Sequence, residues 1–147
     1  TLVDENAADR IMTWIKEAEE AGAEILHGGK KRGASVVPTV LKNPPKQAKV
    51  VCEEVFGPVV SVIPFESMKE AVNEADNSPF GLQVGLFTNQ IDLAHKVAKN
   101  MEVGGVVING TSNFRLDHWP YGSGGDDRIK NDRASNGLSF VSRRWKR

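Results

Sequence analysis

The feature that most constrains this chain is an alternation of strand and helix patterns between residues 59 and 109. Apolar, β-branched runs predict strands over residues 59–63, 83–88 and 106–109. Amphipathic helices are predicted between them, one opening with the Ser67 and Glu70 capping box and one over residues 91–101. This alternation is typical of a largely parallel sheet flanked by helices. The predicted fold class is therefore α/β.

Each predicted helix has an apolar face that we expect to be buried. In the opening helix, capped by Asp4 and ended by Gly22, this face comprises Ala8, Ile11, Ile15, Ala18 and Ala21. In the helix after Ser67 it comprises Ala71, Val72 and Ala75. In the third helix it comprises Leu93, Ala94, Val97, Ala98 and Met101.

The region between the opening helix and residue 59 is less regular. Its residue types predict a short strand over residues 23–26, a turn over 28–33 and a strand over 36–41 interrupted by Pro38. Residues 50–52 are also predicted to be an apolar strand.

Composition excludes several classes of protein. The chain has 147 residues, 19 basic and 19 acidic, which fits a soluble globular domain without a general attraction to nucleic acid. Its single cysteine excludes a disulfide framework or a cysteine-based zinc cluster within one chain, and indicates a reducing, cytoplasmic setting. No apolar run approaches the ~20 residues of a membrane helix.

Cys52 is the one thiol that could act as a nucleophile. Its neighbours Glu53 and Glu54 carry negative charge, which disfavours a thiolate. A structural cysteine in a strand is therefore the favoured interpretation.

The segment from Glu53 to Phe56 has two interpretations. A carboxylate can accept two hydrogen bonds from a vicinal diol such as a ribose. In an extended chain, Phe56 would lie on the same side as Glu54, where its ring could pack against a flat ligand. The alternative is a surface glutamate pair with Phe56 in the core.

Three weaker patterns remain. The glycine-rich residues 28–33 could cradle a phosphate, but a solvated turn is favoured because no helix opens there. His118 could be oriented by Asp117 as an acid or base, or make an ordinary structural hydrogen bond. The cations around Trp145 resemble a single-stranded nucleic-acid binder, but we expect no nucleic-acid partner.

Five ordered blocks resemble the NAD(P)-dependent aldehyde dehydrogenase superfamily. They are EEVFGPV at 53–59, NSPFGL at 77–82, GLFT at 85–88, GGVVIN at 104–109 and PYG at 120–122. The resemblance covers residues 1–122 and implies a partial catalytic domain. Residues 111–120 are most similar to members that act on lactaldehyde, glyceraldehyde 3-phosphate or related small aldehydes.

The resemblance implies roles for six residues. Glu54 would hold the nicotinamide-side ribose of NAD or NADP, and Phe56 would pack by the nicotinamide. Phe114 and Tyr121 would line the substrate tunnel, with Asn113 and His118 as polar contacts. A small aldehyde would be the substrate, and a homo-oligomer is the expected assembly.

The family's cysteine nucleophile, general-base glutamate and dinucleotide-binding glycines would all precede Thr1, so we expect this chain alone to be inactive. Residues 123–147 depart from the family pattern, which predicts a divergent, poorly ordered basic tail and suggests a reading-frame change in the coding DNA. The alternative function is a non-catalytic α/β interaction module that docks on a relative or another partner.

Overall fold

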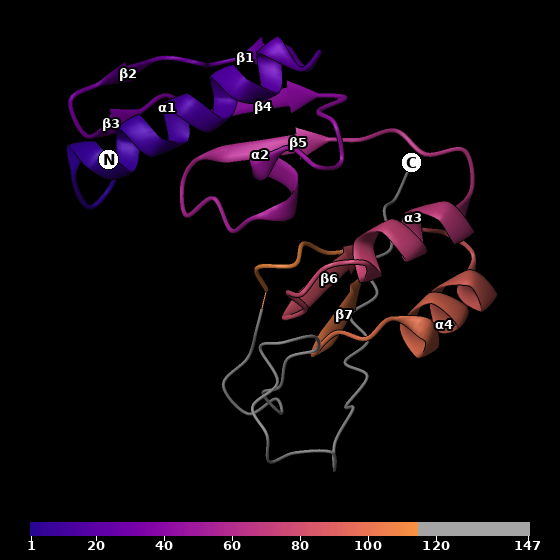
Figure 1. Ribbon diagram of the computed structural model, residues 1–147. Helices are drawn as coiled ribbons and strands as arrows, with labels where there is room; N and C mark the ends of the chain where they lie inside the picture. The colour runs from indigo at the N-terminus through magenta and orange to yellow at the C-terminus, as the bar shows by residue number, and fades with distance from the viewer. Residues whose placement is uncertain (115–147) are drawn as a thin grey trace. The chain divides into compact units, whose positions relative to one another are not determined.

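The computed structural model describes residues 1–114. The chain divides into two compact units, the first spanning Thr1–Phe65 and the second beginning at Glu66 (Figure 1). Each unit is described by itself.

The first unit begins with helix α1 (Glu5–Glu20), which starts and ends as predicted. The Asp4 side chain accepts a hydrogen bond from the Ala7 N–H at 2.7 Å, and Gly22 follows the helix with a φ of +104°. The predicted apolar face is buried at Ala8, Ile11, Ile15 and Ala18. Ala21 is exposed instead, because it is the C-cap, where the chain leaves the helical path.

A three-stranded sheet forms the centre of the first unit (Figure 1). It consists of β1 (Glu24–His27), β4 (Thr39–Lys42) and β5 (Val59–Val62). Strand β4 lies in the middle, antiparallel to β1 and parallel to β5. Two short strands, β2 (Lys31–Arg32) and β3 (Ser35–Val36), pair separately, so the predicted turn contains a strand and Pro38 separates β3 from β4.

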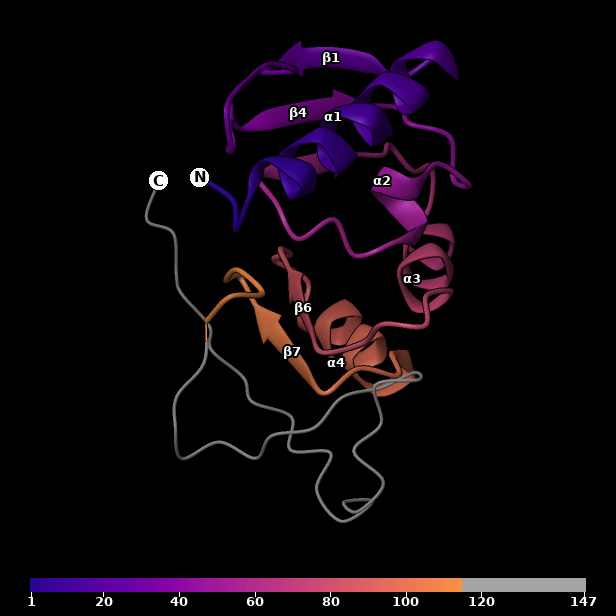
Figure 2. The same ribbon diagram turned by 60° about the vertical axis from the view of Figure 1, so that its left-hand side comes forward.

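One face of this sheet carries the core of the first unit. Thr39 and Leu41 are 1% and 0% exposed, and Leu41 packs in one cluster with Ile11 and Ile15 of α1, which lies along the sheet (Figure 2). Side chains alternate between the faces of a strand. Val60 and Val62 of β5 accordingly lie on the opposite face and remain exposed.

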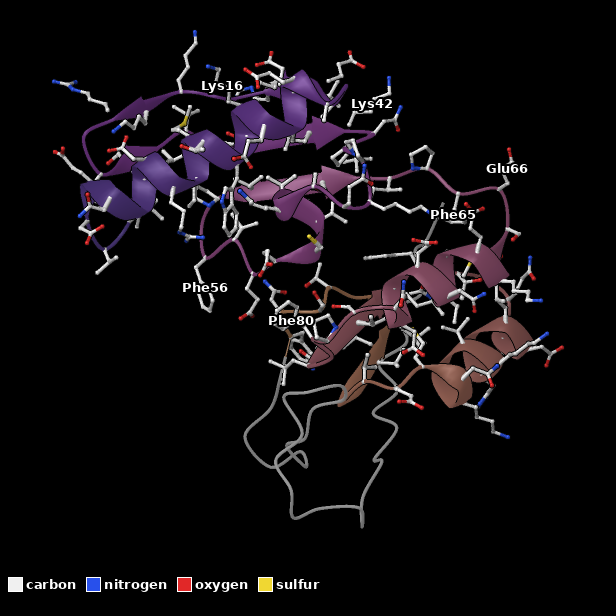
Figure 3. All side chains as sticks on the ribbon, viewed as in Figure 1. Lys16, Lys42, Phe56, Phe65, Glu66 and Phe80 are labelled. Atoms are coloured by element: carbon white, nitrogen blue, oxygen red, sulfur yellow. The ribbon has the colours of Figure 1, made fainter. Side chains whose placement is uncertain are left out.

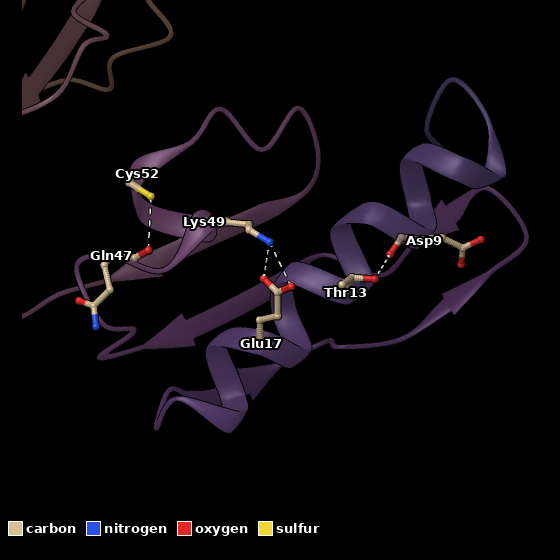
Figure 4. Close-up of polar contacts among 6 residues, drawn as sticks. All are labelled: Asp9, Thr13, Glu17, Gln47, Lys49 and Cys52. Carbon is tan, nitrogen blue, oxygen red and sulfur yellow. Dashed lines mark hydrogen bonds and ion pairs between the residues drawn. The ribbon is translucent and has the colours of Figure 1, made fainter.

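The prediction of a strand over residues 50–52 is wrong, because these residues belong to the short helix α2 (Lys49–Cys52). Its backbone bonds are local, with the Cys52 N–H donating to Ala48 O at 3.1 Å, so no strand partner is needed. Val50 is buried in the same core as α1. Lys49 pairs with Glu17 of α1 at 2.9 Å (Figure 4).

The second unit contains two helices and a parallel pair of strands. They are α3 (Met68–Asp76), β6 (Gln83–Leu86), α4 (Ile91–Asn100) and β7 (Gly105–Ile108). The capping box is confirmed in part: Ser67 Oγ accepts from the Glu70 N–H at 3.2 Å, while the Glu70 carboxylate accepts from the Glu66 N–H at 3.0 Å. Strand β6 is parallel to β7.

The core of the second unit is formed by α4 and its two strands, through Ala94, Ala98, Val106 and Ile108. The predicted apolar face of α4 is buried at Ala94, Val97, Ala98 and Met101, and Leu93 is half-buried. The prediction that α3 buries its apolar face is wrong, because α3 contributes no residue to this core. Ala71 and Val72 are half-buried and Ala75 is exposed.

The α/β class and the order β5-α3-β6-α4-β7 are confirmed. The parallel pairs are β4 with β5 and β6 with β7, in two separate small sheets rather than one continuous layer. None of the helices that the structure describes in residues 1–114 could span a membrane.

Candidate functional site

The loop at residues 53–58, between α2 and β5, carries the predicted ligand residues Glu54 and Phe56. Both side chains are exposed, and Phe56 is 75% exposed. Figure 3 shows Phe56 projecting from the loop, away from α1. The alternative that Phe56 belongs to the core of this unit is therefore wrong.

Phe56 also has an unusual backbone conformation. Its φ is +47°, in the left-handed region, which costs a residue with a Cβ atom roughly 1–2 kcal/mol. The chain is therefore not extended through Phe56, and strand alternation does not explain where its ring lies relative to Glu54. Residues held in such conformations cluster at ligand-binding sites.

Helix α1 contacts this loop through Arg10. The Arg10 guanidinium donates a hydrogen bond from Nη2 to the Val55 carbonyl oxygen at 2.9 Å. Arg10 is not singled out by the sequence pattern, which places it on the polar face of α1 without any sign of a partner 45 residues away. The partner becomes visible only once the loop is folded against the helix.

The glycine-rich residues 28–33 form neither one continuous turn nor a phosphate cradle, because Lys31 and Arg32 belong to β2 and the turn to β3 begins at Gly33. The Gly29 N–H donates to Thr39 Oγ1 at 2.9 Å, and the Thr39 hydroxyl donates to Val37 O at 2.8 Å. An amide committed to the protein in this way is not offered to an anion. The turn prediction is therefore confirmed only at Gly33, and the structure favours a structural role for this segment over anion binding.

The second set of predicted site residues follows β7. Asn113 is exposed and its Oδ1 accepts a hydrogen bond from the Thr111 hydroxyl. Phe114 is 40% exposed, and its carbonyl accepts from Gln83 Nε2 at 3.0 Å. His118 and Tyr121 lie outside the described residues.

The start of this second loop is shaped by Asn109. Its φ is +53°, and its Oδ1 accepts a hydrogen bond from the Thr88 N–H at 2.8 Å. Asparagine tolerates the left-handed region better than most residues. The turn that leads towards Asn113 is thus fixed to the end of β6.

Cys52 is exposed at the carboxyl end of α2, so the prediction of a structural cysteine in a strand is wrong. Its thiol donates to the Gln47 carbonyl oxygen at 3.5 Å (Figure 4). Reactive thiolates are favoured at helix amino ends and beside cations, whereas Cys52 lies at the opposite helix end and bonds to a carbonyl. Among residues 1–114, no cluster of side chains is suited to a metal ion.

The profile of the Aldehyde dehydrogenase family matches residues 1–143. The chain belongs to the aldehyde dehydrogenase family. It is 45% identical to 3-sulfolactaldehyde dehydrogenase from Priestia aryabhattai over 115 residues, which are 78% of this chain and 24% of that enzyme. The chain thus spans about a quarter of the length of the curated aldehyde dehydrogenases that it matches.

Solved aldehyde dehydrogenases have the same fold over this quarter. Aldehyde dehydrogenase 21 from Physcomitrella patens, in complex with the product succinate, matches with a TM-score of 0.83 and 42% identity over 86% of this chain and 26% of its own. The NAD+ complex of aldehyde dehydrogenase from Bacillus cereus matches with a TM-score of 0.79 and 34% identity, over 87% of this chain and 26% of its own. A third match is the NADP complex of glyceraldehyde-3-phosphate dehydrogenase GapN from Methanocaldococcus jannaschii. Its TM-score is 0.80 and its identity 32%, over 86% of this chain and 27% of its own.

Proposed function

We propose that this chain supplies the part of an NAD(P)-dependent aldehyde dehydrogenase that binds the nicotinamide half of the cofactor. Glu54 accepts hydrogen bonds from the two ribose hydroxyls, and Phe56 packs beside the nicotinamide ring. The observation that carries this proposal is the Phe56 ring, which is 75% exposed on the loop that also carries the exposed Glu54, with the Phe56 backbone in a left-handed conformation.

The chemistry of the loop fits this role. A carboxylate has two oxygens and can accept both hydroxyls of a vicinal diol, while charge makes these hydrogen bonds stronger than neutral ones. Burying an exposed Phe side chain against a ligand stabilises the complex by roughly 1.5–3 kcal/mol. The bound nicotinamide supplies the hydride acceptor for oxidation of the aldehyde to the carboxylic acid.

The loop after β7 supplies the substrate side in this proposal. Phe114 and Tyr121 line the tunnel, and Asn113 and His118 contact the polar part of the aldehyde. Relatives named for 3-sulfolactaldehyde, lactaldehyde and sulfoacetaldehyde favour a small aldehyde as the substrate. The bond from Gln83 to the Phe114 carbonyl supports this assignment, because it fixes the loop beside Asn113.

The nucleophilic thiolate in this proposal comes from another segment of the complete enzyme, and not from Cys52. The position of Cys52 at the carboxyl end of α2 supports this view. The chain alone is therefore expected to lack aldehyde oxidation.

The proposal is tested in a complete enzyme in which this chain replaces the aligned quarter of the Priestia 3-sulfolactaldehyde dehydrogenase. Glu54→Gln is expected to raise the KM for NAD+ about tenfold, because the neutral amide offers the ribose diol weaker hydrogen bonds. Steady-state kinetics at saturating aldehyde measure this effect.

Glu53→Gln is the matched control, since it removes the adjacent exposed carboxylate and is expected to leave the KM unchanged. Equal KM values for the two variants would contradict the assignment of Glu54. In the same enzyme, the Cys52→Ala variant is expected to retain aldehyde oxidation. An inactive Cys52→Ala variant would instead identify Cys52 as the nucleophile.

A further inference from the structure

We propose that Arg10 is a positioning residue for the 53–58 loop: from α1 it holds the Val55 carbonyl and so determines where Glu54 and Phe56 are presented. This inference rests on the proposed function of Glu54 and Phe56. It adds a residue that would contact neither cofactor nor substrate.

The first observation is the point at which Arg10 holds the loop. Its guanidinium donates to the Val55 carbonyl oxygen at 2.9 Å in a half-buried setting. A charged donor makes a stronger hydrogen bond than a neutral one. Because Val55 lies between Glu54 and Phe56, fixing its carbonyl restrains the backbone on both sides.

The second observation is that the Arg10 side chain is itself restrained. Its guanidinium carbon lies 4.5 Å from the centroid of the Trp14 ring, a cation–π contact. Trp14 follows four residues later on α1, so both side chains come from the same face of one helix. A planar guanidinium held on a ring loses little further freedom when it binds the Val55 carbonyl.

The third observation is that α1 also packs directly against the loop backbone at Gly57. A methyl group on Gly57 would overlap Ile11 Cδ1 and would lie 3.5 Å from Leu2 Cδ2. The loop backbone therefore touches the helix directly after Phe56. Arg10 thus restrains the loop through a hydrogen bond at Val55, and Ile11 restrains it through van der Waals contact at Gly57.

The fourth observation is the backbone strain at Phe56. A residue with a φ of +47° keeps this conformation only where its surroundings fix it. The exposed Phe56 side chain makes little contact that could do so, since it is 75% exposed. The restraint therefore comes from the backbone on either side, where Arg10 binds Val55 and Ile11 packs on Gly57.

The experiment compares four versions of the full 147-residue chain: the parent, Arg10→Met, Arg10→Lys and Lys16→Met. Arg10→Met keeps an unbranched side chain and removes the donor. Arg10→Lys keeps a charged donor. Lys16→Met is the matched control, because it removes a cation from an exposed position on the same helix.

Two quantities are measured for each version. Amide hydrogen exchange is followed at Val59, whose N–H donates to the Gly57 carbonyl at 2.8 Å. The dissociation constant for nicotinamide mononucleotide is measured by NMR titration. Exchange in the buried part of α1 reports whether the helix itself is intact.

Arg10→Met is expected to raise both the exchange rate of the Val59 amide and the dissociation constant about tenfold, with exchange in α1 unchanged. In Arg10→Lys, the exchange rate and the dissociation constant are expected to stay close to those of the parent. Lys16→Met is expected to give the values of the parent. If the parent binds the nucleotide and Arg10→Met binds it equally well, the positioning role is overturned.

Failure of the proposed function has a different signature. In that case the parent does not bind the nucleotide, and Glu54→Gln matches Glu53→Gln in the complete enzyme. The exchange measurement alone then tests the role of Arg10. That role is overturned if the Val59 amide of Arg10→Met exchanges at the same rate as that of the parent. If Arg10→Met also increases amide exchange in α1, the comparison is made with Arg10→Lys instead. The positioning role of Arg10 is then overturned if the Val59 amide of Arg10→Lys exchanges as fast as that of Arg10→Met while α1 stays protected.

Discussion

Gly28→Ala is expected to lower the free energy of unfolding of the first unit by about 3 kcal/mol, the sum of backbone strain and steric overlap. Gly28 has a φ of +83°, where an alanine is strained. A Cβ atom there would lie 2.6 Å from Thr39 Oγ1 and 2.8 Å from Thr39 Cα. Thr39 is buried in the central strand and cannot move aside without breaking the pairing of β4.

Gly22→Ala separates the two causes. Gly22 also has a positive φ, of +104°, but a Cβ atom there would meet nothing within 4 Å. The control is therefore expected to lose only about 1 kcal/mol, from backbone strain alone. Native-state hydrogen exchange of the β1 and β4 amides measures both values, and equal losses would show that the contact with Thr39 is not decisive.

Gly85→Ala is expected to destabilise the second unit by about 2–3 kcal/mol through overpacking. A Cβ atom on Gly85 would lie 2.6 Å from the Gly110 carbonyl oxygen and 3.1 Å from the Ser112 backbone nitrogen. These are backbone atoms, which cannot change rotamer to make room. The loop that leads to Asn113 and Phe114 would have to move away from β6.

Gly105→Ala is the control, because Gly105 lies opposite Gln83 in the same two-stranded sheet and its nearest contact would be Gln83 Cγ at an ordinary 3.4 Å. It is expected to change the stability by less than about 1 kcal/mol. Exchange of the β6 and β7 amides measures both variants. In the complete enzyme, Gly85→Ala is also expected to raise the KM for aldehyde, and an unchanged KM would argue against a substrate role for this loop.

Elements whose signal is local could be predicted from the sequence. Helix α1 has both a period and a cap, since Asp4 opens it and Ile11 and Ile15 recur on one face. The Ser67 cap of α3 is equally local. Such features depend only on residues a few positions apart, so no knowledge of the tertiary structure is needed.

Elements that depend on distant contacts could not be predicted. Two adjacent β-branched residues suggested a strand at Val50, but its burial beneath α1 and the Lys49–Glu17 ion pair stabilise a single helical turn. Likewise, the pattern of α3 shows an apolar face without showing whether any element covers it. Tertiary packing decides both outcomes.

The candidate site shows the same limit. The residue types of Glu54 and Phe56 indicate a diol and ring site, but the left-handed conformation of Phe56 has no sequence signal, because the glycine stands one position later. Arg10 looks like any other charged residue on the outer face of a helix. Its partner at Val55 is found only in the folded chain.

The parallel pairing of β4 and β5 has a consequence for the order in which the first unit assembles. Residues 28–38 join the antiparallel strands β1 and β4, whereas the longer crossover at 43–58 joins β4 to β5. Closing a longer connection costs more conformational entropy, and parallel pairing is intrinsically slow. We therefore expect β5 to pair after β1 and β4, and Glu54 and Phe56, which belong to that crossover, to reach their native arrangement in that late step.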